Sequence, residues 1–176
     1  ASRFGTGIAG LYLNANEQAL IQLRNLCRQL DCDWEDQDNF IYSKTNRKIL
    51  EEELLTLDML GFPAELAEQL PLPFPTVGAV KFHKQGQFHP RKLLSAIVPM
   101  LTIYENTPVR QLLKNKAITD SGSITAEKII VATHFPFLNK HGSYFMKLYQ
   151  QRSYVLALEN APKMDAMYLD AEENGF

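Results

Sequence analysis

Three glycines near the N-terminus have the spacing that could hold a phosphate group. Gly5, Gly7 and Gly10 match the pattern G-x-G-x-x-G, in which backbone N–H groups at a helix start approach the pyrophosphate of a dinucleotide. The pattern needs a buried strand before it, and only four residues precede Gly5. The strand predicted at residues 40–43 is followed by Lys44 and not by the acid that would hold a ribose. The glycines are therefore interpreted as the flexible start of a helix.

The other chemically active side chains do not form a catalytic or metal-binding motif. Four histidines, at positions 83, 89, 134 and 141, have none of the spacings of H-x-x-x-H or H-E-x-x-H, so no metal site is predicted. The sequence has no nucleophile elbow and no Walker loop, which leaves acyl and phosphoryl transfer without support. Cys27 and Cys32 are interpreted as helix packing and as a loop thiol, in keeping with a reducing cytoplasmic location.

Composition limits the partners that this chain can bind. Among 176 residues, 18 Lys and Arg stand against 20 Asp and Glu, a net charge of −2, which is not the pattern of a nucleic-acid-binding surface. The longest apolar run, residues 96–101, is far shorter than the roughly 20 residues that span a bilayer, so no membrane span is predicted. Hydrophobic residues make up 45% of the chain, enough for a core that needs neither metals nor disulfides.

Apolar residues at intervals of three and four predict the helices. Thr45 or Asn46 can cap the second of them, and Gly61 ends it. Pro63 and Pro90 suit the first turn of two further helices because proline already has a helical φ. The predicted helices are residues 11–30, about 46–60, 63–70 and 91–98.

Aromatic and β-branched residues predict the strands. The proline-rich residues 71–75 are expected to run extended between two packing units. Residues 129–132 are continuously apolar, which is typical of a strand buried on both faces, and a ligand site is expected where that strand ends. The predicted strands are residues 40–43, 77–83, 101–104, 108–113, 117–119, 123–126 and 128–133, the last five as a β-meander, and 153–159 paired with 166–170.

These elements predict an α+β fold, a mixed β-sheet with packed helices. Asn174 and Gly175 form a strong hairpin signal, yet only Phe176 follows them. We therefore expect the chain to be part of a longer protein.

An ordered set of segments carries a family resemblance. Residues 87–94 read Gln-Phe-His-Pro-Arg-Lys-Leu-Leu, residues 107–109 read Thr-Pro-Val, and residues 129–133 read Ile-Ile-Val-Ala-Thr. This succession resembles the middle of the D-amino-acid oxidase family of FAD-dependent oxidoreductases, in which a Pro-Arg-Lys-Leu helix, a Thr-Pro-Val-like segment and an apolar strand ending Ala-Thr-Gly follow one another. The resemblance covers nearly the whole chain.

The resemblance implies which residues lie near the cofactor. The backbone of Val109 would lie against the adenine of FAD, and Ala132 and Thr133 would lie close to the dinucleotide. His134 stands where the family usually has glycine, and it is a further candidate for contact with cofactor or substrate.

The resemblance also implies a substrate side and a division of the chain. Arg152 and Tyr154 would orient a substrate carboxylate or amine, Arg152 through its planar guanidinium. Residues 1–86 and 138–176 would belong to the substrate-binding region, and residues 87–137 to the FAD-binding domain. The remainder of the parent chain would carry the pyrophosphate cradle, so this chain alone is expected to bind FAD poorly or not at all.

By the same resemblance, the intact parent oxidises a small-molecule amine or amino acid by hydride transfer to FAD, with no general base that the sequence identifies. Two alternatives stay open. The chain could belong to a nicotinamide-dependent dehydrogenase, which requires Gly5, Gly7 and Gly10 to form a turn between a strand and a helix. It could also be a non-catalytic α+β binding module.

Overall fold

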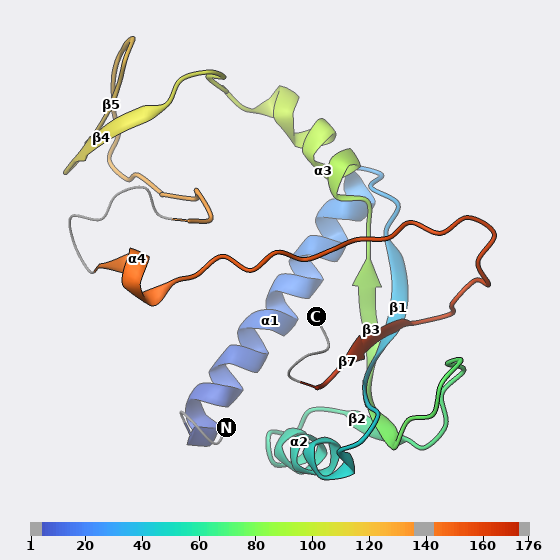
Figure 1. The fold of residues 1–176 in the computed structure, drawn as a ribbon. Coiled ribbons are helices and arrows are strands. Elements are labelled where there is room, and N and C mark those ends of the chain that lie inside the picture. The colour runs from blue at the N-terminus through green and yellow to red at the C-terminus, as the bar shows by residue number, and fades with distance from the viewer. Residues whose placement is uncertain (1–4, 136–142, 173–176) are drawn as a thin grey trace. The chain divides into compact units, whose positions relative to one another are not determined.

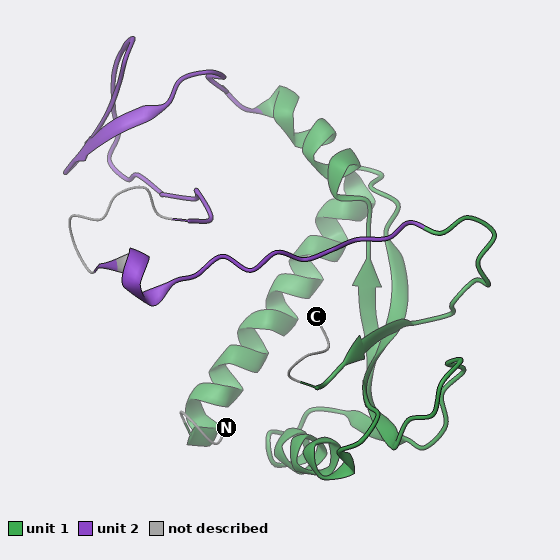
Figure 2. Ribbon diagram, in the orientation of Figure 1, with its two compact units in different colours: residues 1–100, 158–176 green, residues 101–157 purple. Residues whose placement is uncertain are grey.

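In the computed structural model, residues 5–135 and 143–172 are described, and they form two units, each with its own β-sheet (Figure 2). Unit 1 comprises Ala1–Met100 and Leu158–Phe176, and unit 2 comprises Leu101–Ala157. The functional division predicted at residues 86/87 and 137/138 has other boundaries and stays a prediction.

Unit 1 is built on a four-stranded mixed sheet (Figure 1). The strand order is β2-β3-β1-β7, with β3 antiparallel to both β2 and β1 and with β7 parallel to β1. The predicted α+β class with a mixed sheet is therefore confirmed. The strands are β1 (Glu35–Ser43), β2 (Ala64–Ala67), β3 (Gly78–Gln87) and β7 (Met167–Asp170), and the helices are α1 (Gly5–Gln29), α2 (Arg47–Met59) and α3 (Pro90–Ile97), which continues into a 3-10 turn, η1 (Val98–Met100).

The core of unit 1 lies between α2 and one face of the sheet. Leu50 and Leu57 of α2 pack against Val80 of β3, and all three are almost completely buried. Asn46 caps the helix as predicted, because its side chain accepts a hydrogen bond from the N–H of Ile49. The chain turns away at Gly61, where a φ of +69° favours glycine.

The two cysteines lie at the junction of α1 and β1. Cys27 and Cys32 are free and fully buried, and the N–H of Cys32 donates to the carbonyl of Cys27 at 3.0 Å. Burial raises the pKa of the Cys27 thiol. The predicted packing role of Cys27 is confirmed, while Cys32 lies in the loop as predicted but with its side chain buried.

Strand β7 is fastened to the start of α2 by Glu172. One oxygen of this carboxylate accepts hydrogen bonds from the hydroxyl of Ser43 and from both the N–H and the hydroxyl of Thr45, at 2.8 to 2.9 Å. The N–H of Lys44 donates to the same oxygen at 3.1 Å. The C-terminal strand is thereby held beside β1, 129 positions away in the sequence.

Unit 2 contains the three central strands of the five predicted for the β-meander. Strands β4 (Val109–Leu113), β5 (Lys116–Thr119) and β6 (Gly122–Thr125) pair antiparallel in sequence order. Arg110 and Asp120 form a two-pronged ion pair across it, with N–O distances of 2.8 to 3.0 Å. A short helix, α4 (Tyr144–Lys147), is the other regular element described in this unit.

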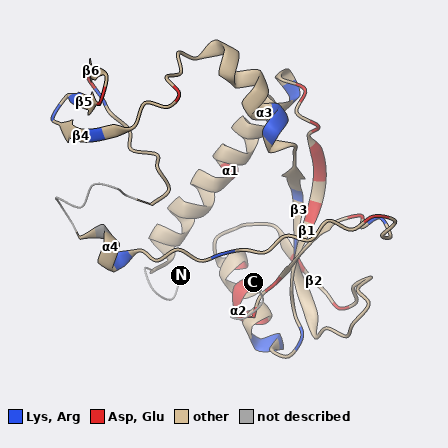
Figure 3. Ribbon diagram, turned by 45° about the horizontal axis from the view of Figure 1, so that its top comes forward, with Lys and Arg blue, Asp and Glu red and all other residues tan. Residues whose placement is uncertain are grey.

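Two predictions in unit 1 differ from the structure. In both, the segment forms a strand because it pairs with β3, and the local sequence does not reveal this pairing. Residues 63–70, predicted as a helix, contain strand β2, which pairs with the edge of β3. Strand β1 begins at Glu35 and not at residue 40, because its acidic first residues pair with the end of β3 across a bulge at Lys84, where φ is +54° (Figure 3).

Three predicted strands are not formed in the described residues. Residues 101–104, 128–133 and 153–159 make no ladder, and β7 pairs with β1 and not with residues 153–159. Ile130, expected to be buried on both faces, is 88% exposed. A strand of this kind needs a neighbour on each side, and the described part of the chain supplies none.

Glu172→Gln is expected to lower the thermal unfolding midpoint at pH 7, because hydrogen bonds to a charged acceptor are stronger than those to an amide. Hydrogen bonds, first from Thr45 and then from Ser43, lower the pKa of Glu172. The stabilisation is therefore complete above the unfolded-state pKa of about 4.3 and is lost as pH falls through the lower folded-state pKa. Thermal melts from pH 7 to pH 3 should show the midpoints of wild type and variant converging.

The control variant is Glu52→Gln, which removes an exposed ion pair with Lys48 on α2 and should change the midpoint very little. Equal midpoints for wild type and Glu172→Gln at pH 7 would contradict the role given to Glu172.

Candidate functional site

The sheet of unit 1 has a face turned away from α2, and this face carries aromatic side chains. Successive residues of a strand point to opposite faces. Because Val80 points to the helices, its cross-strand neighbour Ile41 does too, and Phe40 and Tyr42 point the other way. Tyr168 of β7 lies beside Phe40 in the parallel register and shares its face.

Four rings form two pairs on this side of the sheet. Phe40 and Tyr168 stack with ring centroids 5.3 Å apart and planes 13° from parallel. Tyr42 meets Phe74, from the proline-rich segment after β2, at 5.7 Å and 48°. We call the surface formed by Phe40, Tyr42, Phe74 and Tyr168 the aromatic face.

Each lysine beside the aromatic face is paired with protein carboxylates. The ammonium of Lys81 lies 3.1 Å from Asp38 and 3.3 Å from Glu65, and 5.6 Å from the ring centre of Phe40. These pairings, first the hydrogen bond to Asp38, raise the pKa of Lys81. Burial opposes ionisation of Asp38, yet hydrogen bonds from Lys81 and the Lys84 backbone lower its pKa.

At the other end of the aromatic face, Lys44 is bound to Asp170 at 2.9 Å. The Lys44 ammonium also lies 5.2 Å from the ring centre of Phe74. Burial, and then the negative charge of Asp170, raise the pKa of Tyr42.

His83 completes the charged group at the β2 side of the face. Its Nε2 lies 3.2 Å from Glu65 and its Nδ1 lies 3.5 Å from Asp38.

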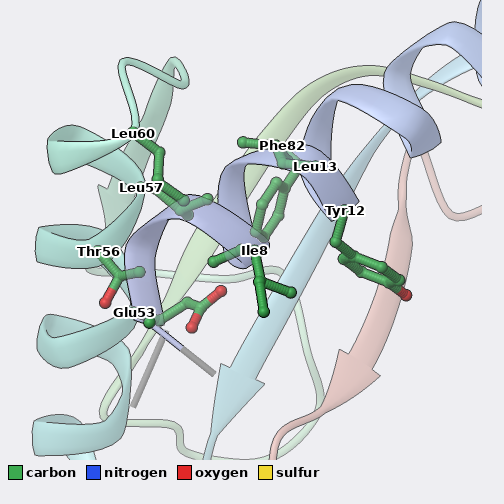
Figure 4. Close-up of a pocket in the computed structure, with 10 residues that line it drawn as sticks. Ile8, Tyr12, Leu13, Glu53, Thr56, Leu57, Leu60 and Phe82 are labelled. Carbon is green, nitrogen blue, oxygen red and sulfur yellow. The ribbon is translucent and has the colours of Figure 1, made fainter. Parts of the chain in front are cut away.

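A cavity of about 530 Å³ lies on the helix side of unit 1, between α1 and α2 (Figure 4). Ile8 and Tyr12 of α1, Leu57 of α2 and Phe82 of β3 line it, and among the described lining residues Glu53 alone is charged. Such a wall has too few polar groups to orient a polar substrate, so the aromatic face is the stronger candidate in unit 1.

Unit 2 has an apolar cavity of about 470 Å³ that brings together three of the predicted cofactor-binding residues. Val109 at the start of β4 lines it together with Ala132 and Thr133. Residues 129–131 also line it, together with residues at and near β4 and β5, so this apolar run lines a cavity although it forms no strand.

His134, the fourth predicted residue, occupies a tight turn next to this cavity. The N–H of Phe135 donates to the carbonyl of Thr133 at 2.7 Å, and the hydroxyl of Thr133 donates to the carbonyl of Phe135 at 3.0 Å. His134, between them, has a φ of +64°. This is the left-handed region that favours glycine, at the position where the resemblance expects glycine.

The predicted substrate residues, Arg152 and Tyr154, lie in an extended stretch of unit 2 that forms no strand. Both side chains are exposed, Tyr154 at 86%. Neither lines the unit 2 cavity or belongs to the sheet of unit 1, so their role stays a prediction.

Sequence reasoning missed the residues of the aromatic face. The signal that could have found them is the alternation of Asp38, Phe40, Tyr42 and Lys44, which places an aromatic and charged series on one side of a strand. It went unnoticed because β1 was predicted to begin only at residue 40.

The glycine pattern lies within α1. Gly5, with a φ of +79°, begins the helix, and Gly7 and Gly10 fall in its first two turns. This agrees with their interpretation as a helix start and counts against the nicotinamide alternative, whose glycines form a turn ahead of the helix.

The described part of the chain contains neither a candidate metal site nor a candidate membrane-spanning helix. No three His, Cys, Asp or Glu side chains there are grouped so that they could hold a metal ion. His141 lies outside the described residues. None of the helices described combines the length and the apolar character needed to cross a bilayer.

Two comparisons with known proteins match nearly the whole chain. Residues 5–174 match the family described as "DAO: FAD dependent oxidoreductase". A protein of Bacillus subtilis (strain 168), "Putative Rieske 2Fe-2S iron-sulfur protein YhfW", is 31% identical over 97% of this chain. The chain spans 36% of the length of that relative.

His134→Val is expected to weaken the turn by about 1 kcal/mol, because a residue with a bulky Cβ is strained at positive φ. The readout is amide hydrogen exchange of Phe135, whose N–H closes the turn. Exchange should be roughly fivefold faster than in wild type after correction for intrinsic rates. In His134→Gly, the matched control, it should be no faster than in wild type, and equal rates in all three proteins would contradict the strain at this position.

Proposed function

Because this chain belongs to the family of FAD-dependent oxidoreductases, we propose that it is part of a longer enzyme that oxidises an amine or an amino acid. The bond between carbon and hydrogen beside the nitrogen breaks, and its electron pair leaves with the hydrogen as hydride. The nitrogen lone pair forms an imine, which water hydrolyses to a carbonyl compound. FAD, when bound, supplies the acceptor for the hydride.

The observation that carries the cofactor part of the proposal is the cavity of unit 2. Val109, Ala132 and Thr133, which the resemblance assigns to the nucleotide, line this one apolar cavity. Its apolar wall suits the flat face of an adenine ring. The left-handed backbone at His134 further supports the proposal, because a positive φ favours glycine and the resemblance expects glycine at this position.

The residues described here fit one wall of an FAD site and not the whole of it. The glycine pattern at Gly5, Gly7 and Gly10 is taken up by α1 and leaves no strand-to-helix turn for a pyrophosphate. We propose that the pyrophosphate is held by parts of the longer protein outside this chain.

The aromatic face is proposed as a surface of unit 1 that contacts the substrate. The rings of Phe40 and Tyr168 would present apolar surface to the carbon skeleton of the substrate. Tyr42, which meets Phe74, extends this apolar surface. Arg152 and Tyr154 are retained as proposed orienting residues on the resemblance alone.

The name of the Bacillus relative raises the question of an iron–sulfur centre as electron acceptor. A Rieske centre takes two cysteine and two histidine ligands. Cys27 and Cys32 are both buried, and the described residues contain no group of side chains able to hold a metal. We propose that any such centre in the longer protein is ligated outside the described part of this chain.

The full-length protein is expected to retain flavin through gel filtration, with absorbance near 450 nm that bleaches when an amine substrate is added without oxygen. An absorbance band in this region is a general property of oxidised flavins. Visible spectroscopy of the purified protein is the test. A colourless protein that does not take up added FAD would refute the proposed function.

Added FAD is expected to leave the thermal midpoint of this chain alone unchanged. A ligand raises the midpoint only when it binds the native state appreciably, and the chain supplies one wall of the site without the pyrophosphate cradle. Differential scanning fluorimetry with and without FAD makes the measurement, with AMP as a probe of the adenine cavity. A clear rise with FAD would mean that the main cofactor contacts lie within this chain.

A further inference from the structure

Among residues 5–135 and 143–172, the lysines beside the aromatic face, Lys44 and Lys81, are not free to receive a substrate carboxylate. Lys81 is within 3.3 Å of two protein carboxylates, and Lys44 is within 2.9 Å of Asp170. A carboxylate arriving from solvent would have to displace one of these acids and leave it unpaired, which is unfavourable for a partly buried group such as Asp170.

The charged groups beside the aromatic face also disfavour the binding of a carboxylate. Asp38 and Glu65 share Lys81, so two carboxylates stand against one ammonium at this end of the face. Such a group attracts an ammonium and repels a carboxylate. The rings add to this preference, since the stacked pair of Phe40 and Tyr168 offers apolar surface to an apolar or aromatic substituent.

We propose, on the basis of the proposed function, that the aromatic face selects amines that carry an aromatic or aliphatic group and no carboxylate. The occupant is a small arylalkylamine whose ring lies against the pair formed by Phe40 and Tyr168. This narrows the substrate class from amines and amino acids to amines alone. Asp38 and Glu65 determine the specificity by keeping Lys81 occupied.

The test uses the full-length protein with its flavin and two ligands that differ only by a carboxylate. The absorbance of the flavin is titrated with 2-phenylethylamine and, separately, with each enantiomer of phenylalanine. The expected result is a Kd for the amine at least tenfold lower than for either enantiomer. Because the readout is binding, it does not require that either compound be turned over.

A double variant and a control variant test whether the charges around Lys81 cause the selectivity. The double variant Asp38→Asn with Glu65→Gln frees Lys81, and the ratio of the two Kd values should fall at least tenfold. Glu52→Gln, which removes an acid from the exposed side of α2, is the matched control and should leave the ratio unchanged. A ratio of affinities is insensitive to a partial loss of folded protein, so instability of the double variant cannot imitate the result.

The two proposals fail in different ways. A protein without flavin refutes the proposed function and, with it, this inference. A protein with flavin that binds phenylalanine as tightly as 2-phenylethylamine, or that binds neither, overturns only the inference. Tighter binding of phenylalanine that is lost in Arg152→Gln would also overturn it, because it would assign carboxylate recognition to Arg152.

Discussion

The parallel pairing of β1 with β7 is the interaction on which the rest of unit 1 depends. It joins segments separated by the whole of unit 2, so the entropy of closing a long loop opposes it. The ladder itself covers only four residue pairs. Glu172 compensates by collecting hydrogen bonds from three consecutive residues at the end of β1. Without this pairing Phe40 would lose Tyr168, and Lys44 would lose Asp170.

The same pairing explains why the open side of the sheet tolerates charge beside aromatic rings. Each lysine lies over a ring and also reaches a carboxylate on a neighbouring strand or at a strand end. The ring covers the ammonium and the carboxylate neutralises it, so neither lysine is a buried, uncompensated charge. A sheet face arranged in this way presents apolar surface to a ligand while its cations are already occupied.

The sequence predicted correctly those elements whose ends are set by nearby residues, such as a capping side chain, a glycine or a proline. Asn46 and Gly61 mark the ends of α2, Pro90 marks the start of α3, and the turns of the meander were placed almost to the residue. The wrong predictions concern segments whose structure depends on pairing with strands that are distant in the sequence. Residues 64–67 have helix-forming composition and become a strand because β3 has a free edge. For the candidate site, Val109, Ala132 and Thr133 came from a resemblance. In the aromatic face, the alternation within β1 is a local signal, whereas the position of Tyr168 beside Phe40 depends on a parallel register that no local pattern encodes.

In unit 2, the sequence predicts a buried strand at residues 129–131, and the structure shows these residues without strand pairing. Their composition is that of a strand in the middle of a sheet, yet in the described chain they pair with no strand, and Ile130 is exposed. They nevertheless help to form the wall against which Val109 and Thr133 lie. A segment with strand composition and no ladder has backbone groups satisfied only by water, and an apolar surface that gains free energy when covered. Strand pairing on both sides of this segment would satisfy those groups and bury Ile130, and it would leave the end of the segment at His134 free to face a ligand.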